Sequence, residues 1–233
     1  MILEIRKKLG KLANKKRAKL LQGFFKTGPG EYGEGDVFLG IQVPVLRKLA
    51  KEYREIAPTA AVQLLKSSVH EERLLALFLL VGAYARGDDA DKKKVYGIYM
   101  KNVPFVNNWD LVDLSAPQIP GDYLVQRSRK PLYTFAKSNN LWKRRIAIIA
   151  TAAFIRQNDF SDTLRISRML LYDGHDLIHK AVGWMLREVG KRHLLTEEGF
   201  LKKHYRSMPR TMLRYAIERF PEAKRKRYLK GSV

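Results

Sequence analysis

The chain has 233 residues, with 45 Lys or Arg against 23 Asp or Glu, so its formal net charge is +22. It contains no cysteine, which excludes disulfides, thiolate zinc sites, iron–sulfur clusters and thiol nucleophiles. Such a charge is typical of proteins whose partner is rich in phosphate, and it predicts binding that weakens steeply with salt. The alternative is a charge that serves only solubility or non-specific adhesion.

The length is compatible with one domain that has a real core, and we expect a single domain over residues 1–233. The longest apolar run, Leu74–Ala85, is well short of the roughly 18 residues that a membrane span needs. The first eight residues have no apolar region and no cleavage signal. We therefore expect a monomer in the cytoplasm, associated with the nucleoid and not with a membrane.

Apolar residues recur with helical periodicity along nearly the whole chain, and no convincing strand alternation is present. The sequence therefore predicts an all-α protein. The predicted helices cover residues 2–25, 43–54, 58–67, 70–86, 89–101, 107–115, 119–127, 130–138, 141–157, 160–172, 175–192, 197–205, 209–220 and 221–230.

Capping residues support several of these boundaries. Ser161 and Thr196 stand where two helices are predicted to begin, and hydroxyl side chains are common N-caps. Pro209 and Pro221 are predicted near first-turn positions, where a missing N–H costs nothing.

The predicted helices come in pairs with a regular period. Small residues recur in similar contexts at Ala76, Ala147, Gly183 and Ala216, at spacings of 71, 36 and 33 residues. A period near 35, with small residues where helices approach, indicates an α-solenoid. It is shorter than the usual HEAT period of about 40–47, so we predict a HEAT-like solenoid of paired helices. A helical bundle without true repeats is the alternative.

Residues 24–40 interrupt this rhythm with five glycines and a proline, which disfavour a helix. The segment lacks the Lys-Ser/Thr ending of a phosphate-binding P-loop. We predict a loop that joins an N-terminal helix to the repeats. The helix and the loop together cover residues 1–42, and the repeats cover 43–233. Tyr32 and Phe38 in this loop could alternatively cover a DNA groove or a lesion.

Four residues have side chains suited to catalysis or DNA binding and follow one another at intervals related to the helical turn and to the repeat length. Trp109 and Asp113 are four residues apart and share one helical face. Arg145 follows Trp109 by 36 residues, and Trp184 follows Arg145 by 39. This spacing predicts that all four lie on the first helices of successive repeats, which line the concave wall of a solenoid. A basic concave wall would seat a DNA duplex.

Structural roles are the alternative for the same residues. Trp109 and Trp184 could be core side chains, and periodicity alone favours the core for Trp184. Asp113 and Arg145 could form a structural ion pair. The polar residue before Trp109, Asn108, favours an exposed ring.

The sequence gives little support to a metal site or a serine nucleophile. His175 and His179 are spaced i, i+4, but the intervening residues lack the Glu of a zinc-protease helix. No Gly-x-Ser-x-Gly elbow occurs. The sequence therefore predicts no metal site, no cofactor and no serine nucleophile.

Four segments, in this order, carry a resemblance to a known family. They read F-L-G-I-Q-V-P at 38–44, W-D-L-V-D at 109–113, L-W-K-R-R-I-A at 141–147 and K-A-V-G-W-M-L-R-E at 180–188. The chain resembles the AlkD-like family of DNA alkylation repair proteins in these segments, and its repeat rhythm is similar throughout.

The resemblance implies all-helical HEAT-like repeats around duplex DNA and a monofunctional glycosylase that excises N3- and N7-alkylated purines in base excision repair. It implies that Asp113 is the catalytic carboxylate, that Trp109 and Trp184 flank the deoxyribose, and that Arg145 holds the backbone phosphate. The expected partner is duplex DNA that contains alkylated purines.

Further DNA contacts are expected at Arg144, Lys180, Arg187 and Gln42. Two other functions use the same scaffold: a non-catalytic DNA-binding protein, and a helical-repeat scaffold for protein or RNA partners.

Overall fold

The computed structural model describes all residues 1–233 and is built of helices. The single β-type contact is an isolated bridge between Val37 and Val69. The all-α, solenoid-like fold predicted from the sequence is therefore confirmed. No helix combines the length and the apolar character that crossing a bilayer requires.

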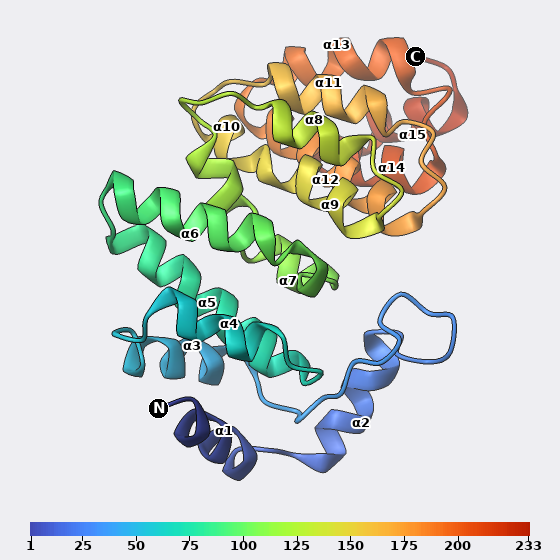
Figure 1. The fold of residues 1–233 in the computed structure, drawn as a ribbon. Helices are drawn as coiled ribbons and strands as arrows, with labels where there is room; N and C mark the ends of the chain where they lie inside the picture. The colour runs from blue at the N-terminus through green and yellow to red at the C-terminus, as the bar shows by residue number, and fades with distance from the viewer. The chain divides into compact units, whose positions relative to one another are not determined.

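The chain divides into two compact units, Met1–Ser115 (unit 1) and Ala116–Val233 (unit 2), and each is described by itself (Figure 1). The single domain expected over residues 1–233 remains a prediction.

Unit 1 is built around α5, His70–Arg86. Its residues 70–80 are all buried, as expected for a helix that is covered on every side, and it packs against α3, α4 and α6. The other helices of the unit are α1 Ile2–Lys11, α2 Lys15–Phe24, α3 Val43–Glu52, α4 Pro58–Leu65, α6 Asp89–Lys101, the 3₁₀ turn η1 Val103–Phe105 and α7 Trp109–Asp113.

The single helix predicted over 2–25 is wrong, because the chain turns between α1 and α2. Asn14 caps α2, with its side-chain oxygen 2.9 Å from the backbone nitrogen of Arg17. Its own N–H donates to the Leu39 carbonyl. Gly40, at φ +80°, lies against this turn so closely that a Cβ would stand 2.3 Å from the Asn14 carbonyl oxygen. The turn therefore depends on a segment 25 residues away.

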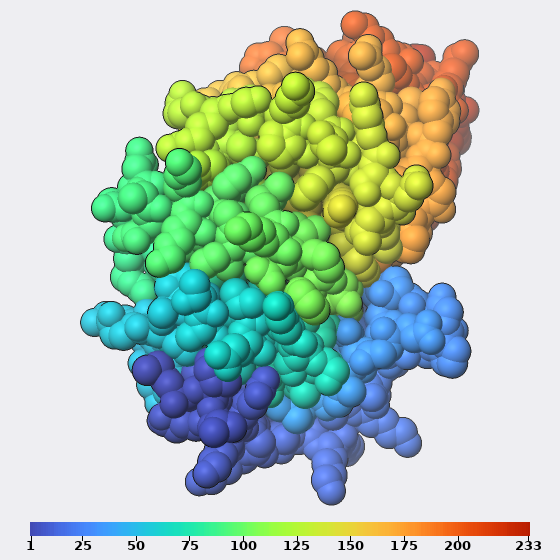
Figure 2. Space-filling view, viewed as in Figure 1, coloured from blue at the N-terminus to red at the C-terminus, as the bar shows by residue number.

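The loop predicted after α2 is present over residues 25–42. It stands out from the side of unit 1 as a light-blue protrusion (Figure 2). Its last part turns back into the unit, where Phe38 is buried.

Unit 2 is built around α12, Asp176–Arg192, which packs against α9, α11, α13 and α14. In Figure 1, α8, α11 and α13 lie on one side of the unit and α9, α12 and α14 on the other. The remaining elements are the π-helical turn η2 Pro117–Gly121, α8 Lys130–Ala136, α9 Leu141–Ala150, α10 Ala152–Arg156, α11 Ser161–Met169, α13 Leu194–His204, α14 Arg210–Ala216, the 3₁₀ turn η3 Ile217–Arg219 and α15 Glu222–Lys230.

Two predicted helices of unit 2 are wrong in extent. The helix over 119–127 is replaced by η2, since Pro117 and Pro120 donate no backbone hydrogen bonds. Gly121 in this turn lies so close to α9 that a Cβ would meet the Ala150 carbonyl oxygen at 2.4 Å. The helix over 141–157 is divided at Thr151, which separates α9 from α10.

The predicted caps are also shifted. His193, rather than Thr196, caps α13, because its Nδ1 accepts the Thr196 N–H at 3.2 Å. Ser161 is the first residue of α11 and not its cap. Pro209 and Pro221 occupy the N-cap positions of α14 and α15, one residue before the predicted place.

The small residues that defined the period lie at helix contacts. Ala76, Ala147 and Ala216 are fully buried. A Cβ on Gly183 would lie 2.4 Å from the Met212 carbonyl oxygen and 2.5 Å from the Tyr215 Cβ. The repeat signal therefore reflects close helix packing, as at α12 and α14.

Candidate functional site

The helix that carries Trp109 and Asp113 is only five residues long and depends on its cap. Asn108 is fully buried, and its Oδ1 accepts the Trp109 N–H at 2.8 Å. Its Nδ2 donates to the Asp36 carboxylate at 3.2 Å. Because a helix of this length is unstable alone, the Asn108 cap and its partner Asp36 fix where Trp109 begins the turn.

Trp109 is half-buried against aromatic rings from the end of α2. The Phe25 ring stacks on it with centroids 5.1 Å apart and planes 9° from parallel. The Phe24 ring meets it edge-on at 5.9 Å, and the Phe38 ring stacks on that of Phe25 with centroids 5.0 Å apart. Trp109 is thus neither a full core residue nor an exposed ring. Phe25 was not among the predicted site residues, although adjacent phenylalanines before a glycine-rich loop are a visible signal.

A buried cluster of four charged side chains links α7 to α5 and to the glycine-rich loop. It consists of Asp36, His70, Arg73 and Asp110. His70 joins the Asp36 carboxylate through Nδ1 at 3.1 Å and the Asp110 carboxylate through Nε2 at 2.8 Å. Arg73 donates to the other Asp36 oxygen at 2.6 Å. Two carboxylates thus face two cationic groups, which is the pairing that buried charges require.

The cluster keeps His70 charged at neutral pH. Burial lowers the pKa of His70, but the Asp110 charge and hydrogen bonds to Asp110 and Asp36 outweigh it and raise this pKa to about 9. Burial raises the pKa of Asp36, yet the hydrogen bond to His70 and the charge of Arg73 lower it overall. The Asp110 carboxylate is therefore neutralised by a cation within unit 1.

Asp113 lies in a different environment, although it is only three residues further on. It is half-buried at the end of α7. Burial raises the pKa of Tyr99, the hydrogen bond between Tyr99 and Ser115 opposes this, and the negative charge of Asp113 raises it further. The helix thus presents one carboxylate that is buried with His70 and a second that remains partly accessible to solvent.

Gln42 lies at the rim of a cavity of about 330 Å³ in unit 1. Phe25, Phe38, His70 and Asp110 also line it, so its lining combines aromatic rings with members of the buried charged cluster. Gln42 itself is exposed and precedes α3 as its N-cap.

The turn before Gln42 is shaped by one carboxylate. Glu71 accepts backbone N–H groups from Leu39, Gly40 and Ile41, at 3.0, 2.7 and 3.2 Å. This arrangement explains why the segment 38–44 has a defined conformation and why the carboxylate of Glu71 tolerates burial.

Arg145 and Trp184 both lie in unit 2, on α9 and α12. Arg145 is only 4% exposed, and its Nη1 donates to the Leu177 carbonyl at the start of α12. Trp184 is half-buried and donates from Nε1 to Glu188 at 3.0 Å. The Arg145 guanidinium is therefore positioned by α12, the helix that carries Trp184.

The three predicted DNA-contacting cations of unit 2 have carboxylate partners. Arg144 donates to Asp173 from Nε at 2.6 Å and from Nη2 at 3.3 Å. Arg187 pairs with Glu218, and Lys180 with Asp176 at 2.7 Å. A phosphate contact at any of these residues would compete with an existing ion pair.

The structure thus brings together Trp109 with Asp113 in unit 1, and Arg145 with the helix of Trp184 in unit 2. The convergence of all four on one concave wall, and their catalytic and DNA-binding roles, stay predictions.

Comparisons with known proteins give the family of the chain and a solved structure with a similar fold. A family model described as DNA alkylation repair enzyme matches residues 5–220. Among solved structures, that of a predicted DNA alkylation repair enzyme from Enterococcus faecalis matches with a TM-score of 0.68 and 18% sequence identity. The match covers 90% of this chain and 97% of that chain, and at this identity it shows a shared fold. None of the curated proteins matches.

Proposed function

Because this chain belongs to the family of DNA alkylation repair enzymes, we propose that it is a DNA glycosylase acting on N3- and N7-alkylated purines in duplex DNA. In this role it hydrolyses the N-glycosidic bond and starts base excision repair. The observation that carries the proposal is the pairing on α7 of a stacked Trp109 with a partly accessible Asp113.

The chemistry of the lesion decides what the protein must supply. A purine alkylated at N3 or N7 is cationic and leaves as a neutral base, so it needs no general acid. Positive charge develops instead on the deoxyribose as the C1′–N bond breaks. A carboxylate near C1′ stabilises this charge and positions water for attack, and Asp113 takes this role.

Trp109 and Trp184 stabilise the same charge from their ring faces. Each cation–π contact contributes about 0.5–2 kcal/mol. Phe25 covers part of the Trp109 ring and holds its plane, so little side-chain entropy is lost when the substrate arrives. The Nε1–H of Trp184 is already bonded to Glu188, which fixes that ring in the same way.

Arg145 contacts the backbone phosphate of the lesion through a charge-assisted hydrogen bond. One guanidinium nitrogen is bonded to the Leu177 carbonyl, which holds the side chain against the start of α12. Arg144, Lys180, Arg187 and Gln42 add weaker contacts to DNA, and the three cations exchange their carboxylate partners for phosphates.

A single-turnover assay on a duplex that contains 7-methylguanine tests the proposal. Asp113→Asn is expected to lower the excision rate by at least about 10²-fold while duplex affinity is retained. The matched control is Asp91→Asn, which removes an exposed carboxylate from α6. Wild-type excision by Asp113→Asn would show that the carboxylate is assigned wrongly.

The same assay separates the alternatives. A wild-type protein that binds the duplex and releases no base is a non-catalytic DNA-binding protein, and one that does not bind DNA is a scaffold for other partners. Arg145→Lys keeps the charge but loses the planar donor set, so it is expected to weaken both duplex binding and the excision rate.

A further inference from the structure

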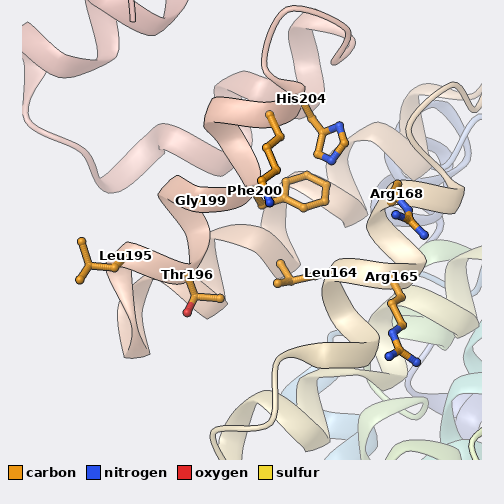
Figure 3. Close-up of a pocket in the computed structure, with 9 residues that line it drawn as sticks. Leu164, Arg165, Arg168, Leu195, Thr196, Gly199, Phe200 and His204 are labelled. Carbon is orange, nitrogen blue, oxygen red and sulfur yellow. The ribbon is translucent and has the colours of Figure 1, made fainter.

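A groove of about 420 Å³ lies between α11 and α13 in unit 2 (Figure 3). Both helices pack against α12, and the groove is the space that remains between them. It lies on the side of the unit that α8, α11 and α13 form, whereas Arg145 and Trp184 belong to α9 and α12 on the other side (Figure 1). The proposed excision chemistry therefore does not use it.

The polar lining of the groove is cationic. Its charged side chains are Arg165 and Arg168 from α11 and Lys203 from α13, beside the polar residues Thr196 and His204, and it includes no Asp or Glu. Other arginines of the same unit, such as Arg129, bind carboxylates directly. A lining that carries positive charge and no carboxylate favours an anionic occupant.

Apolar side chains lie beside these cations. Phe200 forms part of the lining from α13, and its ring packs against that of His204 at 4.6 Å. Leu164 lines the facing wall from α11 (Figure 3). Leu195, at one end of the groove, is 74% exposed, although burying a leucine is worth roughly 1.5–3 kcal/mol. The occupant should therefore supply apolar surface as well as negative charge.

We propose that this groove binds an acidic peptide segment of a partner protein, with its carboxylates on Arg168 and Lys203 and an apolar side chain between Leu164 and Leu195. A peptide fits better than a nucleic acid because a sugar–phosphate backbone satisfies the cations but offers no aliphatic group to cover the leucines. Protein interfaces commonly combine a buried apolar centre with a polar, solvent-accessible rim.

His204 provides an internal probe of occupancy. Burial lowers its pKa, and the charges of Arg168 and Lys203 lower it further, so the ring is neutral at pH 7. A carboxylate bound beside these cations offsets their charge. The pKa of His204, followed by its ring resonances in NMR, therefore rises when the groove is filled by an acidic peptide.

The test uses the full chain and three fluorescein-labelled hexapeptides. The first contains four Asp and two Leu, the second replaces Leu by Ser, and the third replaces Asp by Lys. We expect the first to bind most tightly and to raise the pKa of His204. The double variant Arg168→Glu/Lys203→Glu is expected to bind it at least 10-fold more weakly, and Leu195→Ser several-fold more weakly.

The matched control is Lys202→Glu, which changes an exposed lysine next to Lys203 but outside the lining. Circular dichroism checks that each variant is folded, as expected for exposed positions. Equal loss of binding in Lys202→Glu, or equal binding of the Leu and Ser peptides, would show attraction to net charge alone and overturn the proposal. It is also overturned if the double variant keeps its peptide affinity but loses affinity for unmodified duplex DNA, which would identify a nucleic-acid surface.

Discussion

The ring of Phe25 lies nearly flat on that of Trp109, with centroids 5.1 Å apart and planes 9° from parallel. The two residues are 84 positions apart in the sequence, and the contact joins the end of α2 to the start of α7. The Phe38 ring also stacks on that of Phe25. The glycine-rich segment is thereby attached to the helix that carries the proposed catalytic carboxylate.

Phe25→Leu is expected to lower the excision rate without changing duplex affinity. Leucine fills most of the volume but removes the stacking, worth about 0.5–1.5 kcal/mol beyond burial, so the Trp109 ring loses its fixed plane. Single-turnover excision and duplex titration measure the two effects. Phe78→Leu is the control, because Phe78 is equally buried at 7% exposure and lies against Arg47 instead. A similar rate loss in both variants would attribute the effect to general destabilisation.

Glu197→Gln is expected to stabilise the fold more at pH 8 than at pH 5. Burial, followed by the charge of Glu198, raises the pKa of Glu197 to about 8. In the unfolded state Glu197 loses its proton above its ordinary pKa of 4.5, whereas the folded state keeps the proton up to about pH 8. The free energy of unfolding therefore falls as pH rises from about 4.5 to 8. Glutamine cannot ionise, so this loss disappears. Urea unfolding at the two pH values measures it, with exposed Glu55→Gln as a control that should show no such difference.

The ionisation of His70 is expected to make the free energy of unfolding depend on pH between 6.5 and about 9. Its pKa rises from 6.5 to about 9 on folding, so its contribution is complete below pH 6.5 and is lost as pH rises through 9. The loss is on the order of 3 kcal/mol. Unfolding free energies of Glu197→Gln between pH 6.5 and 9 isolate this dependence, because the Glu197 titration is then absent.

Adding His70→Gln to the Glu197→Gln variant should remove the fall in unfolding free energy between pH 6.5 and about 9. It should also destabilise the protein at every pH by about 3–5 kcal/mol, because Asp36 and Asp110 lose their shared cation. A double variant that keeps the slope of the Glu197→Gln profile would show that His70 is not the titrating group.

Gly183→Ala is expected to destabilise the protein by about 1–3 kcal/mol or more. The added methyl would lie 2.4 Å from the Met212 carbonyl oxygen, and backbone cannot move aside as a flexible side chain can. Gly97→Ala in α6, where nothing lies within 4 Å of the new Cβ, should instead be neutral or stabilising by up to about 1 kcal/mol. Thermal unfolding of the pair measures the difference; equal midpoints would contradict the packing argument.

Local sequence was sufficient to predict most of the helices. Helical periodicity depends on which residues face the core, and α5, α6 and α12 begin and end within a residue of the predicted ranges. The predictions failed where a distant segment decides the backbone. Gly40 fixes the turn before α2. The start of α13 was missed for a local reason, because the His193 side chain, three residues before Thr196, caps this helix.

For the candidate site, the sequence alone determined residue types and spacing: a tryptophan and a carboxylate on one helical face, small residues at a period near 35, and a strongly basic chain. Only the tertiary structure decided which aspartate of α7 is buried against His70. Asp110 is buried with His70, 40 positions away, while Asp113 stays partly accessible. The physical reason is that the state of a carboxylate depends on burial and on nearby charges, and both are set by residues that meet only when the chain is folded.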